Sequence, residues 1–325
     1  MPTDAQKDAF AQIVSDGPAN ALDVETLAQT LKNDPIGERT DDRLAFAGVL
    51  AHAAFAAPDR TAQVYDAAAR GWCGGLDAEP IAPLETAPSP LPEGLMDAFW
   101  ALVADATAGK LDAIGITTRS AALGGLFNAA FQARVGEACL AFPGVKAAAE
   151  QGIPAKFTLD QLADGPDGSL SNAFYRLITE KNFDLEVLDR DELGLEVLPF
   201  PIAYLNVRAL QCHDLWHIAA GYETTALHEI AISGWQMGQF GHSYSAMFLA
   251  VTAAIACQSP QPGGFNFLMD VVLSGWKHGR ETPPILGADW EGVWHKQIPA
   301  VREALGVQAY ASPYPADIIE QMQAA

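Results

Sequence analysis

Helical periodicity dominates the pattern of apolar and polar positions along the chain. One apolar face recurs at helical spacing in Val24, Leu27, Ala28 and Leu31. Asp23, just before this face, belongs to a residue type that favours helix N-caps, and Thr40 is placed to cap a second helix. Alternation typical of strands is rare. Its best example, residues 183–187, is compatible with a short strand or an extended loop, so we expect an all-α fold.

Five prolines between residues 80 and 92 interrupt the helical pattern. Proline lacks a backbone donor and fixes φ, so this stretch is expected to be an extended linker. We therefore expect an N-terminal helical extension at residues 1–75, a proline-rich linker at 76–93 and a larger helical domain at 94–325. The predicted architecture is an irregular multi-helix bundle with an additional N-terminal helical unit.

Two apolar stretches predict buried helices. Residues 121–142 are rich in alanine, glycine and phenylalanine. Residues 246–257 form an apolar run that is interrupted by Thr252. This run is too short to span a bilayer and is typical of a helix in a protein core.

The chain has 325 residues and is acidic, with 40 Asp and Glu against 19 Lys and Arg and a net charge of −21. Such a surface repels phosphate backbones and anionic lipid headgroups, so we expect no nucleic-acid partner and no electrostatic membrane anchor. The four cysteines have no C-x-x-C spacing, which argues against a disulfide framework and a cysteine zinc site. No basic or apolar leader opens the sequence, so a cytoplasmic location is expected.

The segment from Arg208 to Gln239 carries the candidate chemistry. His213 and His217 are four residues apart, so they lie one turn apart on one face of a helix. Asp214 lies about 100° from His213 and about 60° from His217 around the helix axis. Two imidazoles and a carboxylate therefore converge on one arc. This is the arrangement of the H-E-x-x-H helix of metalloproteases, with Asp in place of Glu.

Glu229 is the candidate for a fourth ligand. On one unbroken helix it would point about 120° away from His217. Gly221 is expected to end the first helix, and Thr224 or Thr225 can cap a new helix that folds back toward the first. Imidazole nitrogens combined with carboxylate oxygens suit zinc, iron, cobalt or manganese. Asp214 either ligates the metal itself or orients a ligating histidine without binding the metal.

A structural interpretation of these residues competes with the metal site, because two histidines four residues apart occur by chance on many helices. The residues around them indicate a largely buried helix; they are Leu215, Trp216, Ile218, Ala219 and Ala220. Burying two histidines and an aspartate without a metal or a hydrogen-bond network would be costly.

The motif H-D-x-x-H, then eleven residues, then E resembles the hallmark of the ubiquinone (coenzyme Q) biosynthesis protein 4 family. The likeness covers roughly residues 94 to 310. Its other parts are Gly168-Ser169-Leu170 with Phe174, Tyr204 and Arg208 before the first histidine, residues 275–280, Trp290-Glu291 and residues 301–306. Ser171 departs from the family, in which many members have Gly. Residues 1–75 lie outside the likeness.

The resemblance implies an all-helical fold with a divalent metal on His213, Asp214, His217 and Glu229. It implies zinc first, with iron, cobalt or manganese as alternatives. The implied activity is an oxidative decarboxylation in ubiquinone biosynthesis, in which the carboxylate of a polyprenylated 4-hydroxybenzoate-derived ring is replaced by hydroxyl. An alternative is a non-catalytic lipid-binding scaffold with a structural metal, which organises the other ubiquinone biosynthesis proteins. A zinc-protease-like hydrolase is a weaker third hypothesis, because the glutamate base of H-E-x-x-H is missing.

The resemblance further suggests a homo-oligomer that is peripheral to the inner face of a membrane. Asp214 and Arg208 are the catalytic candidates, since Arg208 could clamp the leaving carboxylate. A salt bridge from Arg208 to one of the many acidic residues is the structural alternative. A groove for the prenyl tail could involve Leu123, Gly124, Leu126, Phe127 and Phe131, or the helix at residues 247–255. Each of these sets could equally be core packing.

Overall fold

Helices account for all the regular structure in residues 1–18, 23–36, 39–186 and 189–324, which the computed structural model describes. The elements are α1 (Asp4–Asp16), α2 (Val24–Lys32), α3 (Thr40–Phe55), η1 (Pro58–Arg60), α4 (Thr61–Cys73), α5 (Leu95–Thr107), α6 (Ala113–Gly124), α7 (Ala129–Leu140), α8 (Val145–Ala149), α9 (Leu159–Ala163), α10 (Leu170–Lys181), η2 (Leu195–Val197), α11 (Ile202–Ala220), α12 (Ala226–Phe240), α13 (Ser243–Ala256), α14 (Gly264–Glu281), η3 (Glu291–Val293), α15 (Ile298–Leu305) and α16 (Ile318–Ala324).

This arrangement confirms the predicted all-α class. The described chain contains one isolated β-bridge, between Ser169 and Gln297, and no strand. Residues 183–186 form no strand, and Val187 lies outside the described residues. Asp23 caps α2 as predicted, accepting a hydrogen bond from the Thr26 backbone. The prediction that Thr40 caps this helix was wrong, because Thr40 is the first residue of α3 and Arg39 is its N-cap.

The N-terminal helices pack directly on the C-terminal half of the chain. Helix α3 contacts α13, and α4 contacts α14. The Phe46 and Phe265 rings, from α3 and α14, meet edge to face at 6.3 Å between centroids. Asp66 of α4 forms a buried ion pair with Arg280 of α14, with 3.0 Å between Oδ1 and Nε. The proline-rich segment between α4 and α5 contains no helix, while the division into domains at 75 and 93 stays a prediction.

The two predicted buried helices have different outcomes. Helix α13 is buried over most of its length, as predicted for residues 246–257. Residues 121–142 do not form one buried helix. They are divided between α6 and α7, and many of them are exposed. The break falls at 125–128, where Asn128 caps α7 by accepting a hydrogen bond from the Phe131 backbone.

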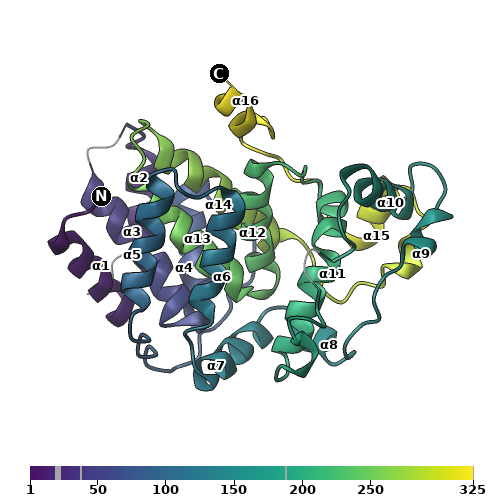
Figure 1. Cartoon of the computed structure of the whole chain (residues 1–325), viewed down its shortest axis with the longest axis horizontal. Helices are drawn as coiled ribbons and strands as arrows, with labels where there is room; N and C mark the ends of the chain where they lie inside the picture. The colour runs from purple at the N-terminus through teal and green to yellow at the C-terminus, as the bar shows by residue number, and fades with distance from the viewer. Residues whose placement is uncertain (19–22, 37–38, 187–188, 325) are drawn as a thin grey trace.

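Helix α11 lies between two groups of helices (Figure 1). The larger group contains α1–α6 and α12–α14, and the smaller group contains α8–α10 and α15. Glycines at positions 234 and 275 allow the backbones of α12 and α14 to pack against each other, which fixes the position of α12 facing α11. Among the described helices, none combines the length and apolar character needed to cross a membrane.

Candidate metal centre

The turn after α11 brings α12 back toward the histidine pair. Helix α11 ends at Gly221, whose φ of 79° is the left-handed conformation that suits glycine. Thr225 then caps α12 by accepting a hydrogen bond from the His228 backbone. Both features agree with the sequence prediction. They place Glu229 in the first turn of the second helix, where it faces His213 and His217.

Two overlapping groups of the predicted metal ligands form here, and His213 and His217 belong to both: Glu229 contacts the two histidines, and Asp214 lies near them. His213 Nε2 lies 3.1 Å from Glu229 Oε2, and His217 Nε2 lies 3.3 Å from Glu229 Oε1. The two Nε2 atoms are 3.3 Å apart. Ligand atoms of His213, Asp214 and His217 all lie within 4.8 Å of one another.

These separations fit a cation-binding donor set. Four ligands at roughly 2.05 Å from a tetrahedral zinc are about 3.3 Å from one another. The distances among the two imidazole nitrogens and the Glu229 oxygens have this size. Asp214 is only 7% exposed, and no hydrogen bond or ion pair reaches its carboxylate from the described residues. A buried carboxylate without a partner is costly, so a cation would compensate it.

The electrostatics of the cluster differ between its two carboxylates. Burial raises the pKa of Asp214, against the opposing charges of His213 and His217. Burial would also raise the pKa of Glu229, but the hydrogen bonds and charges of the two histidines outweigh it and hold that pKa well below its usual range. At His213, burial would lower the pKa, yet the contact with Glu229 raises it. Glu229 is therefore the fixed negative charge of the cluster.

One contact to this cluster was missed by sequence reasoning. Gln236 of α12 is buried, and its amide nitrogen lies 2.7 Å from His213 Nδ1. The signal was available, because Gln236 follows Glu229 by seven residues and so leaves α12 on the same face. His217 differs, since its Nδ1 is buried and has no hydrogen-bond partner among the described residues.

Arg208 makes contacts that neither predicted role anticipated. Its guanidinium donates to the backbone oxygens of Leu286, at 3.0 Å, and Ala288, at 2.7 Å. A third bond, of 2.8 Å, goes to the side-chain oxygen of Gln211. No ion pair to Arg208 occurs within the described ranges. These contacts tie α11 to the segment that follows α14, and the proposed role toward a carboxylate stays a prediction.

The remaining histidines near the motif have structural contacts. His228 is buried, and its Nδ1 accepts a hydrogen bond of 2.7 Å from the Glu223 backbone. His278 contacts the Tyr222 hydroxyl at 2.7 Å and the backbone oxygen of Gln308 at 2.9 Å. These bonds hold the turn between α11 and α12.

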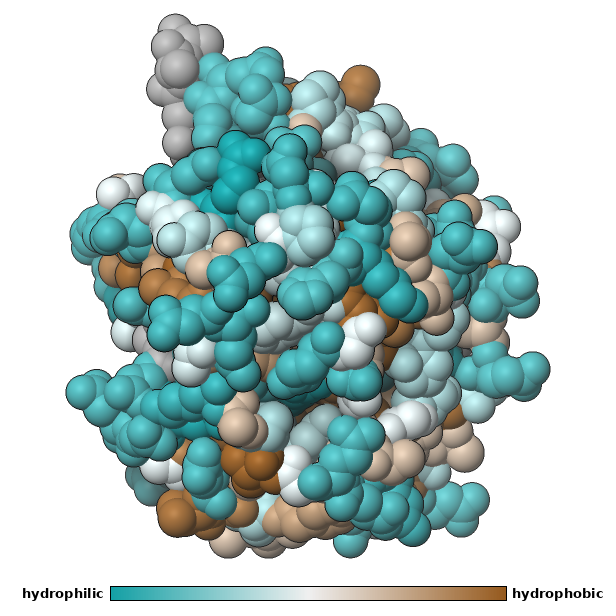
Figure 2. Space-filling model, turned by 90° about the vertical axis from the view of Figure 1, so that its right-hand side faces the viewer, coloured by the Kyte–Doolittle hydropathy of each residue, from teal (hydrophilic) through white to brown (hydrophobic). Residues whose placement is uncertain are grey.

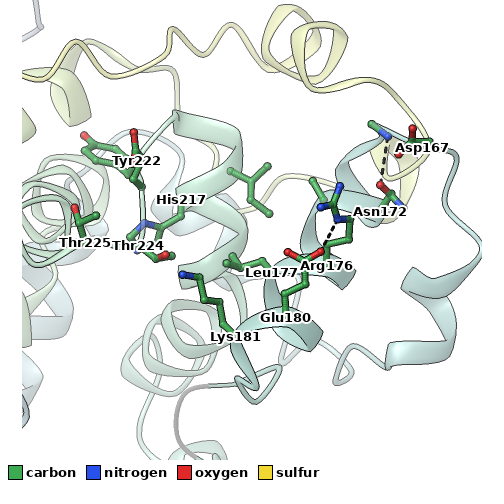
Figure 3. Close-up of a pocket in the computed structure, with 14 residues that line it drawn as sticks. Asp167, Asn172, Arg176, Leu177, Glu180, Lys181, His217, Tyr222, Thr224 and Thr225 are labelled. Carbon is green, nitrogen blue, oxygen red and sulfur yellow. Dashed lines mark hydrogen bonds and ion pairs between the residues drawn. The ribbon is translucent and has the colours of Figure 1, made fainter. Parts of the chain in front are cut away.

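A pocket of about 520 Å³ opens beside His217. Residues of α10 form one wall, and the end of α11 with the following turn forms the other (Figure 3). Lys181 and Leu177 extend from α10 toward the side that carries His217 and Thr224. Arg176, also in the wall, is paired with Glu180 at 2.8 Å. The pocket is therefore lined by both polar and apolar surface, and it reaches His217, the one described residue of the cluster in its wall.

Residues 95–311, well over half of the chain, match the family described as coenzyme Q (ubiquinone) biosynthesis protein Coq4. The chain belongs to the Coq4 family. The matched range contains the histidine–carboxylate cluster and α10 of the pocket wall, and it excludes α1–α4. Membership supports a role in ubiquinone biosynthesis and confirms the family resemblance.

Individual Coq4 relatives match a shorter part of the chain. The mitochondrial ubiquinone biosynthesis protein COQ4 of Komagataella phaffii is 24% identical over 46% of this chain and 48% of its own length. The mitochondrial COQ4 homolog of Drosophila melanogaster is 27% identical over 38% of this chain and 46% of its own length. The chain thus spans about half the length of the curated relatives it matches. A crystal structure of a Nostoc punctiforme protein, provisionally described as a ubiquinone biosynthesis protein, aligns with a TM-score of 0.48 at 25% identity, over 67% of this chain and 98% of that one.

Several Coq4-like positions outside the motif have packing roles in this chain. Ser171, where many family members have Gly, donates a hydrogen bond of 3.1 Å to the Trp294 backbone oxygen. Arg302 donates to the backbone oxygens of Ile218 and Ala219, at 3.1 and 2.9 Å, near the end of α11. The two Arg302 bonds fasten the helix that carries both histidines.

Proposed function

We propose that this Coq4-family protein is a metal-dependent enzyme of ubiquinone biosynthesis. In this proposal His213, His217, Glu229 and Asp214 hold a divalent cation, with zinc as the first candidate. The reaction replaces the ring carboxylate of a polyprenylated 4-hydroxybenzoate derivative with hydroxyl. With water as the oxygen source, the ring carboxylate and water give the ring hydroxyl, carbon dioxide, one proton and two electrons, and an external two-electron acceptor has to take up those electrons.

A single observation supports the proposal most strongly. Glu229 arrives from a second helix to contact both imidazoles, beside a buried and unpaired Asp214. A metal-free network could satisfy both imidazoles through Glu229, but it would leave the Asp214 carboxylate without a partner among the described residues, and a cation would compensate that charge. The pocket at His217 adds access for a small molecule.

Other residues of the chain would bind the substrate and support the metal ligands. A bound cation would supply Lewis acidity beside the ring carbon that exchanges carboxylate for hydroxyl. Lys181 lines the same pocket, and no ion pair involves it within the described ranges, so it is the cation best placed to bind a substrate carboxylate. Asp214 would supply a second carboxylate beside the two imidazoles. Arg208 supports α11 through its contacts with Leu286 and Ala288.

The size of the pocket suits the ring and not the tail. A volume of about 520 Å³ is in the range of sites for drug-sized ligands, so a long prenyl chain has to lie outside it. The end of the molecule formed by α9, α10 and α15 is mostly hydrophilic, with a few hydrophobic patches (Figure 2). Large exposed apolar side chains occur just before α11, at Leu193, Val197, Leu198 and Phe200. We propose that this segment contacts a membrane surface, which would make the protein peripheral.

The proposal is tested by metal analysis combined with lipid analysis. The purified full chain should contain about one divalent cation per protomer. Cells that lack the gene should accumulate a prenylated ring still carrying its carboxylate, and the natural gene should remove it. Glu229→Ala should fail to do so, while Glu137→Ala, at an exposed glutamate on α7 that does not line the pocket, serves as the matched control.

Two outcomes would count against the enzyme. A chain without metal, together with normal quinone levels in the Glu229→Ala strain, would reject the metal centre. If Glu229→Ala fails only to the extent that folded protein is lost, the non-catalytic scaffold with a structural metal is favoured instead. Association with copies of itself and with other ubiquinone biosynthesis proteins is also proposed, and co-purification from the same cells tests it.

A further inference from the structure

The helix that supplies Glu229 also contacts the second nitrogen of the same histidine ring. Glu229 and Gln236 are seven residues apart on α12, which is nearly two full turns, so their side chains share one face. Glu229 Oε2 lies 3.1 Å from His213 Nε2, and Gln236 Nε2 lies 2.7 Å from His213 Nδ1. One face of α12 therefore holds this imidazole at both nitrogens.

The position of Gln236 is fixed by its surroundings. Its side chain is 4% exposed, so bulk water does not compete strongly for the amide. The opposite face of α12 packs on α14 at Gly234, where a Cβ atom would lie 2.6 Å from the Val272 carbonyl oxygen. This close approach leaves little freedom for α12 to rotate, and hence little freedom for Gln236 to leave His213.

The contact bears on which ring nitrogen carries the proton. A neutral imidazole has one proton, and the nitrogen without it is the one that can bind a metal. With the amide nitrogen of Gln236 donating to Nδ1, the ring proton is on Nε2 and faces Glu229. Binding a metal through Nε2 requires the proton on Nδ1, where it needs an acceptor. Rotation of the amide by 180° places its oxygen where the nitrogen was, so Gln236 can provide that acceptor.

We infer that Gln236 is a positioning residue that holds His213 with its proton on Nδ1 and its Nε2 directed at a cation. This inference rests on the metal centre of the proposed function and adds the residue that prepares one of its ligands. His217 Nδ1 is buried without a hydrogen-bond partner in the described ranges, so the ring of His213 is the one held in this way.

Three variants of the full chain test the inference. Gln236→Met keeps the length of the side chain but removes both donor and acceptor. Gln236→Glu keeps an acceptor in the same place. The matched control is Gln239→Met, one turn further along α12, because Gln239 bonds to the backbone of Gly279, Thr282 and Ile285 and makes no bond to a histidine.

The first measurement is Zn²⁺ affinity, obtained by competition with a chromogenic chelator. The second is the absorption spectrum of the Co²⁺-loaded chain. Removing such a supporting contact typically weakens metal binding by about 10- to 100-fold. We expect that loss for Gln236→Met, together with altered Co²⁺ bands. Gln236→Glu should bind at least as tightly as the natural chain. Gln239→Met should lose stability while its folded fraction keeps the natural affinity and spectrum.

The outcomes separate this inference from the proposed function. If Gln236→Met binds Zn²⁺ as the natural chain does, or if Gln236→Glu is weakened as much as Gln236→Met, the role of Gln236 is wrong and the metal centre stands. If the natural chain itself binds no metal, the proposed centre fails and the inference fails with it.

Discussion

Gly275 of α14 lies so close to Ala231 of α12 that a Cβ atom at Gly275 would be 2.1 Å from the Ala231 carbonyl oxygen. The same kind of contact recurs one turn later, where a Cβ atom at Gly279 would be 2.3 Å from the Trp235 carbonyl oxygen. The two helix backbones therefore touch over successive turns. Since Glu229 points away from this contact, the packing of α14 determines how α12 presents its carboxylate to α11.

Replacing Gly275 with alanine should disturb both stability and the site. An added methyl group meets backbone, which cannot move aside as a side chain can, so Gly275→Ala should lower the free energy of unfolding by about 1–3 kcal/mol. Urea denaturation measures this change. The control is Gly124→Ala on α6, where the nearest atom to an added Cβ is the Met247 sulfur at 3.5 Å. The control should be neutral or slightly stabilising, and equal effects of the two substitutions would contradict the packing argument.

The ion pair between Asp66 and Arg280 should couple the N-terminal helices to the rest of the molecule. Both side chains are buried, and Asp66 also accepts a hydrogen bond of 2.9 Å from the Trp276 indole. Removing one partner of a buried pair leaves the other charge uncompensated, so Asp66→Ala should destabilise the full chain by about 3–5 kcal/mol. The exposed pair of Arg70 on α4 and Glu25 on α2 lies within the N-terminal helices and serves as the comparison. Arg70→Ala should change the free energy of unfolding by less than about 1 kcal/mol. A large effect of Arg70→Ala with a small effect of Asp66→Ala would refute this ranking.

The sequence predicted the elements of the site better than their packing. The spacing of His213 and His217, the break at Gly221 and the cap at Thr225 are local signals, and the structure contains each of them. These signals place Glu229 near the start of a second helix. They carry no information on the rotation of that helix, which depends on its contact with α14. The seven-residue spacing from Glu229 to Gln236 therefore becomes informative only once Glu229 is known to face the histidines.

Residues 121–142 illustrate a second limit of sequence interpretation. Alanine and glycine are compatible with either a buried helix or an exposed one, because they have little side chain to bury. Phe131 is buried, whereas Leu126 is 43% exposed in the break between α6 and α7. The contacts of Arg208 could not be predicted from the sequence either. Its partners are the backbone oxygens of Leu286 and Ala288, which are distant in sequence and carry no side-chain signal.

Stability should fall as pH falls from about 7.5 to 5.5. His52 is buried, and its Nδ1 lies 2.9 Å from the Val14 carbonyl oxygen. Burial lowers the pKa of His52, helped by the positive charges of Arg60 and Arg134, although the bond to Val14 opposes the shift. The unfolded chain, with a histidine pKa of about 6.5, therefore binds the proton at a higher pH than the folded chain. Protonation then favours unfolding, and the stability from His52 is lost as pH decreases through this range.

The measurement is the free energy of unfolding at several pH values for the natural chain and for His52→Gln. The variant should show a smaller slope over this range, whatever its absolute stability, because the titrating group is gone. An unchanged slope would mean that other groups account for the pH dependence. His278, whose pKa burial also lowers, is the next residue to test.

Arg208 should matter more for stability than for chemistry. Arg208→Met leaves the carbonyl oxygens of Leu286 and Ala288 without their charged donor, and hydrogen bonds to charged groups contribute about 1.5–3 kcal/mol each. Arg208→Lys cannot bond to both oxygens through a planar fork, so it should rescue the stability only in part. Denaturation gives the loss, and product per folded molecule gives the chemistry. A fall of more than about tenfold in product per folded molecule would instead support the predicted carboxylate clamp.

Metal removal provides the most direct link between the cluster and the fold. His213 and His217 come from α11 and Glu229 comes from α12, so a cation bound by all three would add a strong link between two helices that already contact each other through side chains. A ligand that binds only the folded state at a thousand times its dissociation constant stabilises by about 4 kcal/mol. Treatment with a chelator should therefore lower the melting temperature of the natural chain, and added Zn²⁺ should restore it. Glu229→Gln should respond far less, because it has lost the charge that favours a cation, while Glu223→Gln should respond as the natural chain does. Equal responses of these two variants would show that any metal effect arises elsewhere in the molecule.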